Sequence, residues 1–285
     1  MILQDIQCKI KEIQIHTRRL ISGTLIGDTR SAQKGSGLDF DQIREYQQGD
    51  DVRFIDWKSS ARTNKLLVKQ YTEERSRTII LAVDVSASSS FSSTDQLKSD
   101  IMSQVSSILA LVAYYGSDRV ALLLFSDVVE LFIPPGKSKY HVHAIMQKLF
   151  FFKPRGKKTD IGIALDYIAR LKKKDSVVFL VSDFVSPDFS KQLSVVAKKY
   201  EIVAVRCLDN NEYALPQVGL LTVQDPETNQ CYTISCSDEL NVFLRKRMVD
   251  QNNIFRKYGV DCIEVIPKKQ FIGDLIRFFR KRMRY

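Results

Sequence analysis

The stretch Thr78 to Ser90, TIILAVDVSASSS, decides the fold of this chain of 285 residues. Residues 79–83 are all apolar, which is the pattern of a strand buried on both faces in a parallel sheet covered by helices. Asp84, Ser86 and Ser88 follow where this strand should end. Ligands of open α/β sheets bind beyond the carboxyl ends of the strands, so these side chains form a candidate site. One carboxylate and two hydroxyls suit Mg²⁺, which prefers oxygen ligands.

The triplet also has an ordinary structural explanation. Ser and Asp are common loop residues, and a turn followed by a helix N-cap at Ser92, Ser93 or Thr94 would give the same pattern. Taken alone, the triplet favours that explanation, and its context has to decide between the two.

Apolar strands and helical patterns alternate along the chain from residue 78 to residue 283. After the first strand we expect strands at 120–125, 128–133, 177–181, 202–207 and 262–266, and helices at 97–116, 138–151, 160–171, 188–199, 238–257 and 269–282. Residues 128–133 should pair back on the preceding strand, and residues 219–235 should form a second hairpin, to which the sequence assigns no role. This order predicts a doubly wound, mostly parallel α/β sheet of the Rossmann type with right-handed crossovers.

The predicted sheet supplies context for the triplet. Asp183 ends one apolar strand as Asp84 ends another, and Thr159 is expected to cap the helix at 160–171. If the two strands are neighbours, these side chains converge on one cation above the sheet. The candidate metal ligands are therefore Asp84, Ser86, Ser88, Thr159 and Asp183.

In order and spacing, these five residues resemble the metal-ion-dependent adhesion site of the von Willebrand factor A-like fold, and the likeness covers about residues 76–285. The resemblance implies that the two Ser and the Thr coordinate the ion directly, while the Asp residues often act through water. An acidic side chain of a partner protein would complete the shell. Mg²⁺ is the expected cofactor, with Mn²⁺ and Ca²⁺ as alternatives. Lys157 and Lys158 depart from the pattern, because many relatives have glycines there.

The N-terminal quarter of the chain has a different character. Apolar residues at helical spacing from Ile2 to Leu20 predict an amphipathic helix that ends near Gly23, before a loop that contains four glycines. We expect residues 1–75, this helix and a family-specific extension, to pack on a main domain of residues 76–285.

Residues 40–62, FDQIREYQQGDDVRFIDWKSSAR, resemble the signature of an uncharacterised bacterial family with a von Willebrand factor A-like domain, whose members are commonly associated with MoxR-type AAA+ ATPases. The resemblance implies such an ATPase, or its client, as the partner. The interleaved charges predict a paired network with Trp57 as its apolar anchor, in preference to a partner-docking surface. The expected pairs draw on Arg44, Arg53, Arg62, Asp50, Asp51 and Asp56.

Composition limits the remaining options. The net charge of +10 permits anionic partners without identifying one, and the five scattered cysteines contain no Cys-x-x-Cys pair, so neither a disulfide framework nor a zinc site is indicated. No apolar run approaches 18 residues, and Asp5 and Glu12 stand where a signal peptide would be apolar. We expect a soluble, cytoplasmic protein.

The composition of the site favours binding over catalysis. The ion would have few anionic protein ligands, so it would stay electrophilic enough to attract a carboxylate of a partner protein. We expect a metal-dependent protein–protein interaction module that works with a MoxR-type ATPase in assembly or maturation of a protein complex. We expect neither enzyme activity nor catalytic residues.

Two other functional classes remain alternatives. An Mg-dependent phosphohydrolase would use an aspartyl-phosphate, but Ser86 stands where the second Asp of Asp-x-Asp is needed. His141 and His143 are expected to face solvent rather than act as ligands. The third class is nucleic-acid binding through the basic C-terminus, although a solvated helix end explains those residues better. The basic residues are Arg277, Arg280, Lys281, Arg282 and Arg284.

Overall fold

The structure is a computed structural model, and it divides the chain into two compact units, Ile26–Ser76 and the remainder. The residues that it describes are 34–35, 39–72, 77–90, 97–171, 176–209, 219–224, 230–236, 238–266, 273, 275 and 277–278. The helix predicted between residues 2 and 20 lies outside these ranges, as does most of the helix predicted at 269–282.

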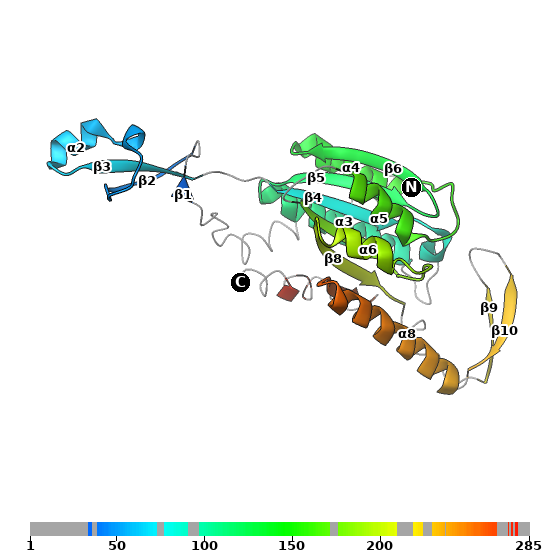
Figure 1. Cartoon of the computed structure of the whole chain (residues 1–285). Helices are drawn as coiled ribbons and strands as arrows, with labels where there is room; N and C mark the ends of the chain where they lie inside the picture. The colour runs from blue at the N-terminus through cyan, green and yellow to red at the C-terminus, as the bar shows by residue number, and fades with distance from the viewer. Residues whose placement is uncertain are drawn as a thin grey trace. The chain divides into compact units, whose positions relative to one another are not determined.

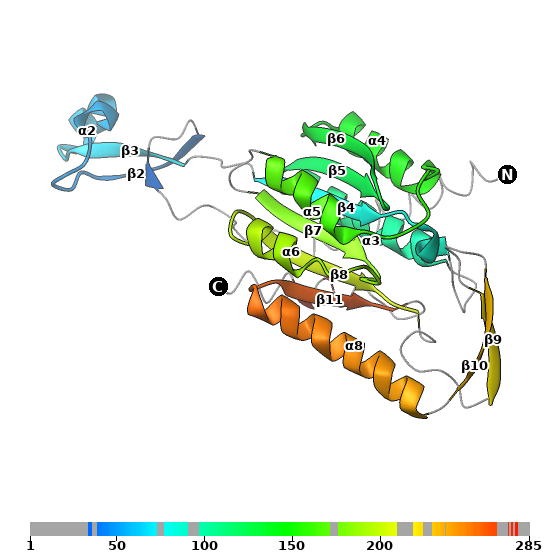
Figure 2. The same ribbon diagram turned by 45° about the vertical axis from the view of Figure 1, so that its right-hand side comes forward.

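A six-stranded sheet forms the centre of the larger unit, in the order β11-β8-β7-β4-β5-β6. Figure 1 shows this unit, and Figure 2 labels every strand of the sheet. Neighbouring strands run parallel except β6, which lies antiparallel to β5 at one edge and so forms the predicted hairpin. The predicted doubly wound, mostly parallel α/β sheet is confirmed. The strands are β4 (Thr78–Asp84), β5 (Arg119–Phe125), β6 (Val129–Gly136), β7 (Ser176–Ser182), β8 (Glu201–Cys207) and β11 (Asp261–Val265).

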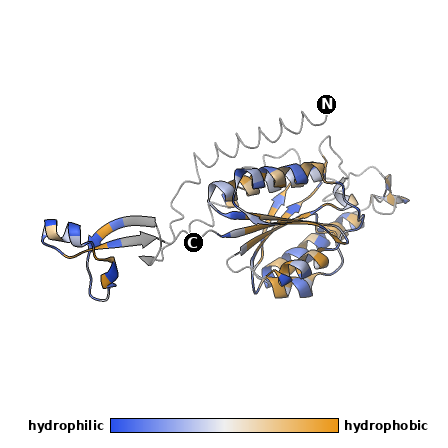
Figure 3. Ribbon diagram, turned by 90° about the horizontal axis from the view of Figure 1, so that it is seen from above, coloured by the Kyte–Doolittle hydropathy of each residue, from blue (hydrophilic) through white to orange (hydrophobic). Residues whose placement is uncertain are grey.

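Helices cover both faces of this sheet, as the edge-on view in Figure 3 shows. Alternate residues of β4 enter two separate apolar clusters, Ile79 and Leu81 on one face and Ile80 and Ala82 on the other. This explains why the strand is apolar throughout rather than alternating. One face packs against α3 (Lys98–Tyr115) and α4 (Lys139–Phe151), and the other against α5 (Ile161–Arg170), α6 (Ser190–Val196) and α8 (Asp238–Lys257).

The strand order reverses between β4 and β7. From β4 the chain goes to β5 and β6 on one side, and it then crosses to β7 on the other side (Figure 2). The two strands are parallel with Val83 opposite Val181, so their carboxyl ends lie together. Ligands of open α/β sheets bind at such a switch point.

The larger unit also contains a two-stranded hairpin. The hairpin predicted within 219–235 is confirmed as β9 (Leu220–Gln224) paired antiparallel with β10 (Cys231–Ser235).

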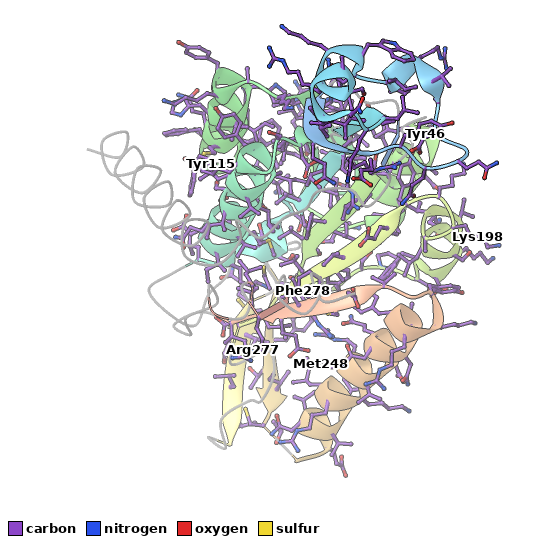
Figure 4. All side chains as sticks on the ribbon, turned by 90° about the vertical axis from the view of Figure 1, so that its left-hand side faces the viewer. Tyr46, Tyr115, Lys198, Met248, Arg277 and Phe278 are labelled. Carbon is purple, nitrogen blue, oxygen red and sulfur yellow. The ribbon has the colours of Figure 1, made fainter. Side chains whose placement is uncertain are left out.

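On α8, Met248 is buried, whereas Lys198 after α6 is exposed, and Figure 4 labels both side chains. Among the helices in the described ranges, none has the length and apolar character needed to span a membrane.

The smaller unit contains an antiparallel three-stranded sheet in the order β1-β3-β2. The strand β3 precedes β4 in the order of elements along the chain, but it belongs to this sheet and not to the main one. The elements are β1 (Lys34–Gly35), β2 (Asp39–Glu45), the short 3-10 helix η2 (Val52–Phe54), α2 (Trp57–Thr63) and β3 (Leu67–Thr72).

The charge network predicted for this segment forms in part. The Arg44 guanidinium donates two hydrogen bonds to Asp50, at 2.7 and 2.8 Å, and Arg53 pairs with Asp51 at 2.6 Å. Asp56 pairs with Lys69 at 3.5 Å, and it also caps α2 by accepting a hydrogen bond from the backbone N–H of Ser59 at 3.1 Å. Trp57 is 67% exposed, so the expected apolar anchor is not formed within this unit.

Candidate metal centre

The candidate centre begins with Asp84 at the end of β4. Its Oδ2 accepts a hydrogen bond from the Ser182 hydroxyl of β7 at 2.7 Å, and its Oδ1 accepts one from the Ser86 backbone N–H at 2.9 Å. The side chain is deeply buried, and Asp84 as a whole is 2% exposed. Burial, together with the nearby charge of Asp183, raises the pKa of the Asp84 carboxyl to about 6. The sheet register therefore brings the carboxyl groups of Asp84 and Asp183 close together at this edge.

Three hydroxyl groups lie together beside these carboxylates. The Thr159 Oγ1 lies 2.7 Å from Ser86 Oγ and 3.4 Å from Ser88 Oγ, and the two serine oxygens are 3.0 Å apart. We call these three oxygens the hydroxyl triangle. Ser86 and Thr159 are buried, whereas Ser88 is half-buried and marks the side that solvent can reach.

The position of Thr159 corrects its predicted role. Asp160, and not Thr159, is the N-cap of α5, because its side chain accepts a hydrogen bond from the Ile163 backbone N–H. The Thr159 hydroxyl donates instead to Ser86, which is 73 residues earlier in the chain. A cap and a neighbouring ligand are indistinguishable in sequence, since both are hydroxyl or carboxyl residues just before a helix.

A set of hydrogen bonds fixes the loop that carries Thr159. Glu130 Oε1 on β6 accepts from the backbone N–H groups of Arg155 and Gly156, at 2.9 and 2.7 Å, and from the Ser126 hydroxyl at 2.8 Å. Burial alone would raise the pKa of the Glu130 carboxyl, but these three hydrogen bonds outweigh it and hold the pKa below its ordinary value. The Ala87 N–H also donates to the Lys157 carbonyl oxygen at 2.9 Å.

Sequence reasoning missed a cation in the centre. The Lys98 ammonium on the first turn of α3 donates to Asp183 Oδ2 at 2.9 Å, and both side chains are 1% exposed. The other oxygen of Asp183 accepts from the Val185 backbone N–H at 3.0 Å. One signal was available in the sequence: a lysine at the start of a helix is unfavourable beside the positive end of the helix dipole, so its presence there calls for a partner.

Two further predictions concern the start of α3 and the histidines. The N-cap of α3 is Leu97, which makes no side-chain cap, and the candidate caps at residues 92–94 lie outside the described residues. His141 was expected to face solvent but is half-buried: its Nε2 lies 2.7 Å from the carbonyl oxygen of Val120, at the start of β5. A carbonyl only accepts, so Nε2 carries the proton and donates. His143 is exposed, as expected.

The donor set fits a hard divalent cation. Oxygens on adjacent vertices of a Mg²⁺ octahedron, with metal–oxygen distances of about 2.0–2.1 Å, lie about 2.9 Å apart, which is close to the sides of the hydroxyl triangle. Such separations are also hydrogen-bond distances, so the hydroxyls satisfy one another without an ion. In the described ranges, no three His, Cys, Asp or Glu side chains gather as a metal site, so an ion here would depend on the hydroxyls.

Residues 42–253 match the family described as "Protein of unknown function DUF58". The chain belongs to this family. Uncharacterized protein Rv1480 of Mycobacterium tuberculosis is 25% identical to this DUF58 protein over 282 residues, which cover 96% of this chain and 89% of the relative. Uncharacterized protein YeaD of Bacillus subtilis is 33% identical over 63 residues, which cover 22% of this chain and 16% of the relative.

Two solved structures are similar to this chain, and the first of them indicates a shared fold. The conserved hypothetical protein BatB from Bacteroides thetaiotaomicron superposes with a TM-score of 0.50 and 12% identity, covering 73% of this chain and all (100%) of that chain. The SpRpn10 VWA domain gives a TM-score of 0.41 and 8% identity, covering 70% of this chain and 93% of that domain. At these identities the likeness concerns the fold alone.

Proposed function

We propose that this DUF58 protein is a metal-dependent protein–protein interaction module. Asp84, Ser86, Ser88, Thr159 and Asp183 would hold Mg²⁺, and a carboxylate of a partner protein would complete the shell. The observation that carries the proposal is the hydroxyl triangle, whose sides of 2.7, 3.0 and 3.4 Å match one face of a Mg²⁺ octahedron beside two carboxylates. A bound ion would supply an electrophilic centre for an anionic oxygen.

The surroundings of the centre support binding rather than chemistry. Both oxygens of Asp84 accept hydrogen bonds and the residue is buried, which suits a fixed ligand better than a nucleophile that must reach a phosphate. Lys157 and Lys158, beside Thr159, are exposed. They add positive charge at the rim, which favours an acidic partner and speeds its approach.

The identity of the partner is proposed on the family resemblance. A MoxR-type AAA+ ATPase, or its client, would supply the acidic side chain, and the pair would act in assembly or maturation of a protein complex. The protein would work in the cytoplasm and without enzyme activity of its own.

Thermal unfolding with and without Mg²⁺ tests the metal site. Ligand at 100 times its dissociation constant adds about 2.7 kcal/mol to the native state, so the wild-type protein should melt at higher temperature with Mg²⁺. Asp84→Asn should lose this shift. Asp118→Asn is the matched control, because Asp118 lies before β5 at the opposite end of the strands, where it accepts a hydrogen bond from the Arg77 backbone N–H at 2.9 Å. An equal shift in wild type and Asp84→Asn would refute the metal site.

Capture of a MoxR-type ATPase tests the partner. We expect binding that is lost with a chelator, restored by Mg²⁺ and lost again in Asp84→Asn. Binding that withstands both the chelator and the substitution would exclude the metal-mediated contact.

A further inference from the structure

The Lys98–Asp183 pair places the ammonium group of a lysine inside the proposed metal centre. The ammonium lies 2.9 Å from an oxygen of Asp183, and the pair is sealed from water, with both side chains 1% exposed. The partners are 85 residues apart in sequence and come from α3 and from the loop after β7. Burial raises the pKa of the Cys207 thiol at the end of β8, the nearby charge of Asp183 adds to this rise, and that of Lys98 opposes it.

Two local features indicate that this lysine belongs to the centre rather than to the helix surface. Lys98 is the first residue of α3, where the dipole of an 18-residue helix opposes a cation. A lysine is also almost never fully buried unless it is paired. Its position therefore costs free energy locally, and the contact with Asp183 is what offsets that cost.

The charges of the centre define what the lysine does. As carboxylates, Asp84 and Asp183 contribute −2, and Lys98 as an ammonium brings the sum to −1. A divalent ion then makes the loaded centre +1, whereas without the lysine the loaded centre would be neutral. The lysine thus opposes the ion and favours an additional anion beside it.

We propose that Lys98 is a built-in counter-cation that weakens binding of the metal alone and makes the metal and a partner's carboxylate bind cooperatively. This inference rests on the proposed function. Without a partner, the ammonium compensates the buried carboxylates and keeps the metal-free centre folded. With a partner, the carboxylate neutralises the extra charge, so each ligand raises the affinity for the other by the same factor.

The test measures Mn²⁺ affinity by electron paramagnetic resonance, with acetate as the carboxylate probe. Lys98→Met keeps the length of the side chain and removes its charge, and we expect it to bind Mn²⁺ at least tenfold more tightly than wild type. Acetate should tighten Mn²⁺ binding to wild type more than to Lys98→Met. The metal-free variant should melt at lower temperature than wild type and recover on addition of Mn²⁺.

Two control variants separate charge from shape and position. Lys98→Arg keeps the charge and should bind Mn²⁺ as weakly as wild type. Arg206→Met removes another buried cation, which packs against Phe255 and α8 on the opposite face of the sheet. It should lower stability and leave Mn²⁺ affinity unchanged.

Each outcome decides between distinct conclusions. Equal Mn²⁺ affinity in wild type and Lys98→Met would overturn the role of Lys98 and leave the proposed function standing. If Lys98→Met binds Mn²⁺ and wild type does not, even in the presence of acetate, the result would support the opposition between lysine and metal and would overturn the proposed function. Absence of binding in both would overturn both. A Lys98→Met protein that stays unfolded at saturating Mn²⁺ would also contradict the inference, because the ion then cannot replace the ammonium.

Discussion

Gly156 offers a direct test of how the Thr159 loop is held. A Cβ built on Gly156 would lie 2.0 Å from Asp127 Oδ1, 2.2 Å from Ser126 Oγ and 3.0 Å from Ser126 Cβ. The Asp127 side chain can rotate away, but Ser126 is fully buried and its hydroxyl is engaged with Glu130. Gly156→Ala must therefore displace the loop from β6.

The size of the effect follows from the contacts that move. If the loop is displaced, Glu130 loses the hydrogen bonds that the backbone N–H groups of Arg155 and Gly156 donate to it. A hydrogen bond to a charged acceptor contributes about 1.5–3 kcal/mol to stability. Water recovers part of this, because Glu130 is only half-buried. Adding the strain of overpacking, we expect Gly156→Ala to lower the free energy of unfolding by about 2–4 kcal/mol. It should also reduce the Mg²⁺-dependent stabilisation, because Thr159 moves with the loop.

Urea unfolding measured with and without Mg²⁺ gives both quantities. Gly116→Ala is the control: the nearest contact of its added Cβ is 3.4 Å, in the range of ordinary packing, and Gly116 has a φ of −77° that alanine adopts freely. We expect Gly116→Ala to change stability by about 0.5 kcal/mol or less in magnitude. The reasoning fails if Gly156→Ala unfolds like wild type, or if it unfolds early and yet retains the full response to Mg²⁺.

Two further predictions concern residues outside the ligand set. The Glu130 pKa is lower in the folded protein than its ordinary value of 4.5, so this carboxylate stabilises the fold above pH 4.5, and that contribution is lost as the pH falls through the folded pKa. In Glu130→Gln the difference in unfolding free energy between pH 7 and pH 3 should therefore be smaller than in wild type. Urea titrations at the two pH values measure this difference. An unchanged difference would exclude this role of Glu130. Arg206 is 1% exposed and bonds to Glu264 and Gln251, both at 3.1 Å, and to Asn252. Arg206→Met should lower the free energy of unfolding by about 2–3 kcal/mol in denaturant titration. This is less than the roughly 3–5 kcal/mol for breaking a fully buried pair, because Glu264 stays partly solvated. A wild-type unfolding curve would contradict this prediction.

The sheet and the edge that holds the candidate site follow from local sequence patterns. A continuous apolar run such as residues 79–83 is a local pattern, and burial on both faces is its physical cause, so β4 and the alternation that follows it were predictable. The carboxyl ends of parallel strands meet at one edge, which is why the sequence predicts that Asp84 and Asp183 lie together.

The groups that surround those carboxylates come from segments distant in the sequence, so local patterns could not predict them. The ion pair of Lys98 joins residues 85 apart, and the Thr159 hydroxyl reaches a residue 73 positions away rather than capping its own helix. Local propensity describes each of these residues as a helix start, and it carries no information about which distant group lies opposite. The charge balance of the candidate centre therefore depends on contacts that form only when α3, β4 and β7 pack together.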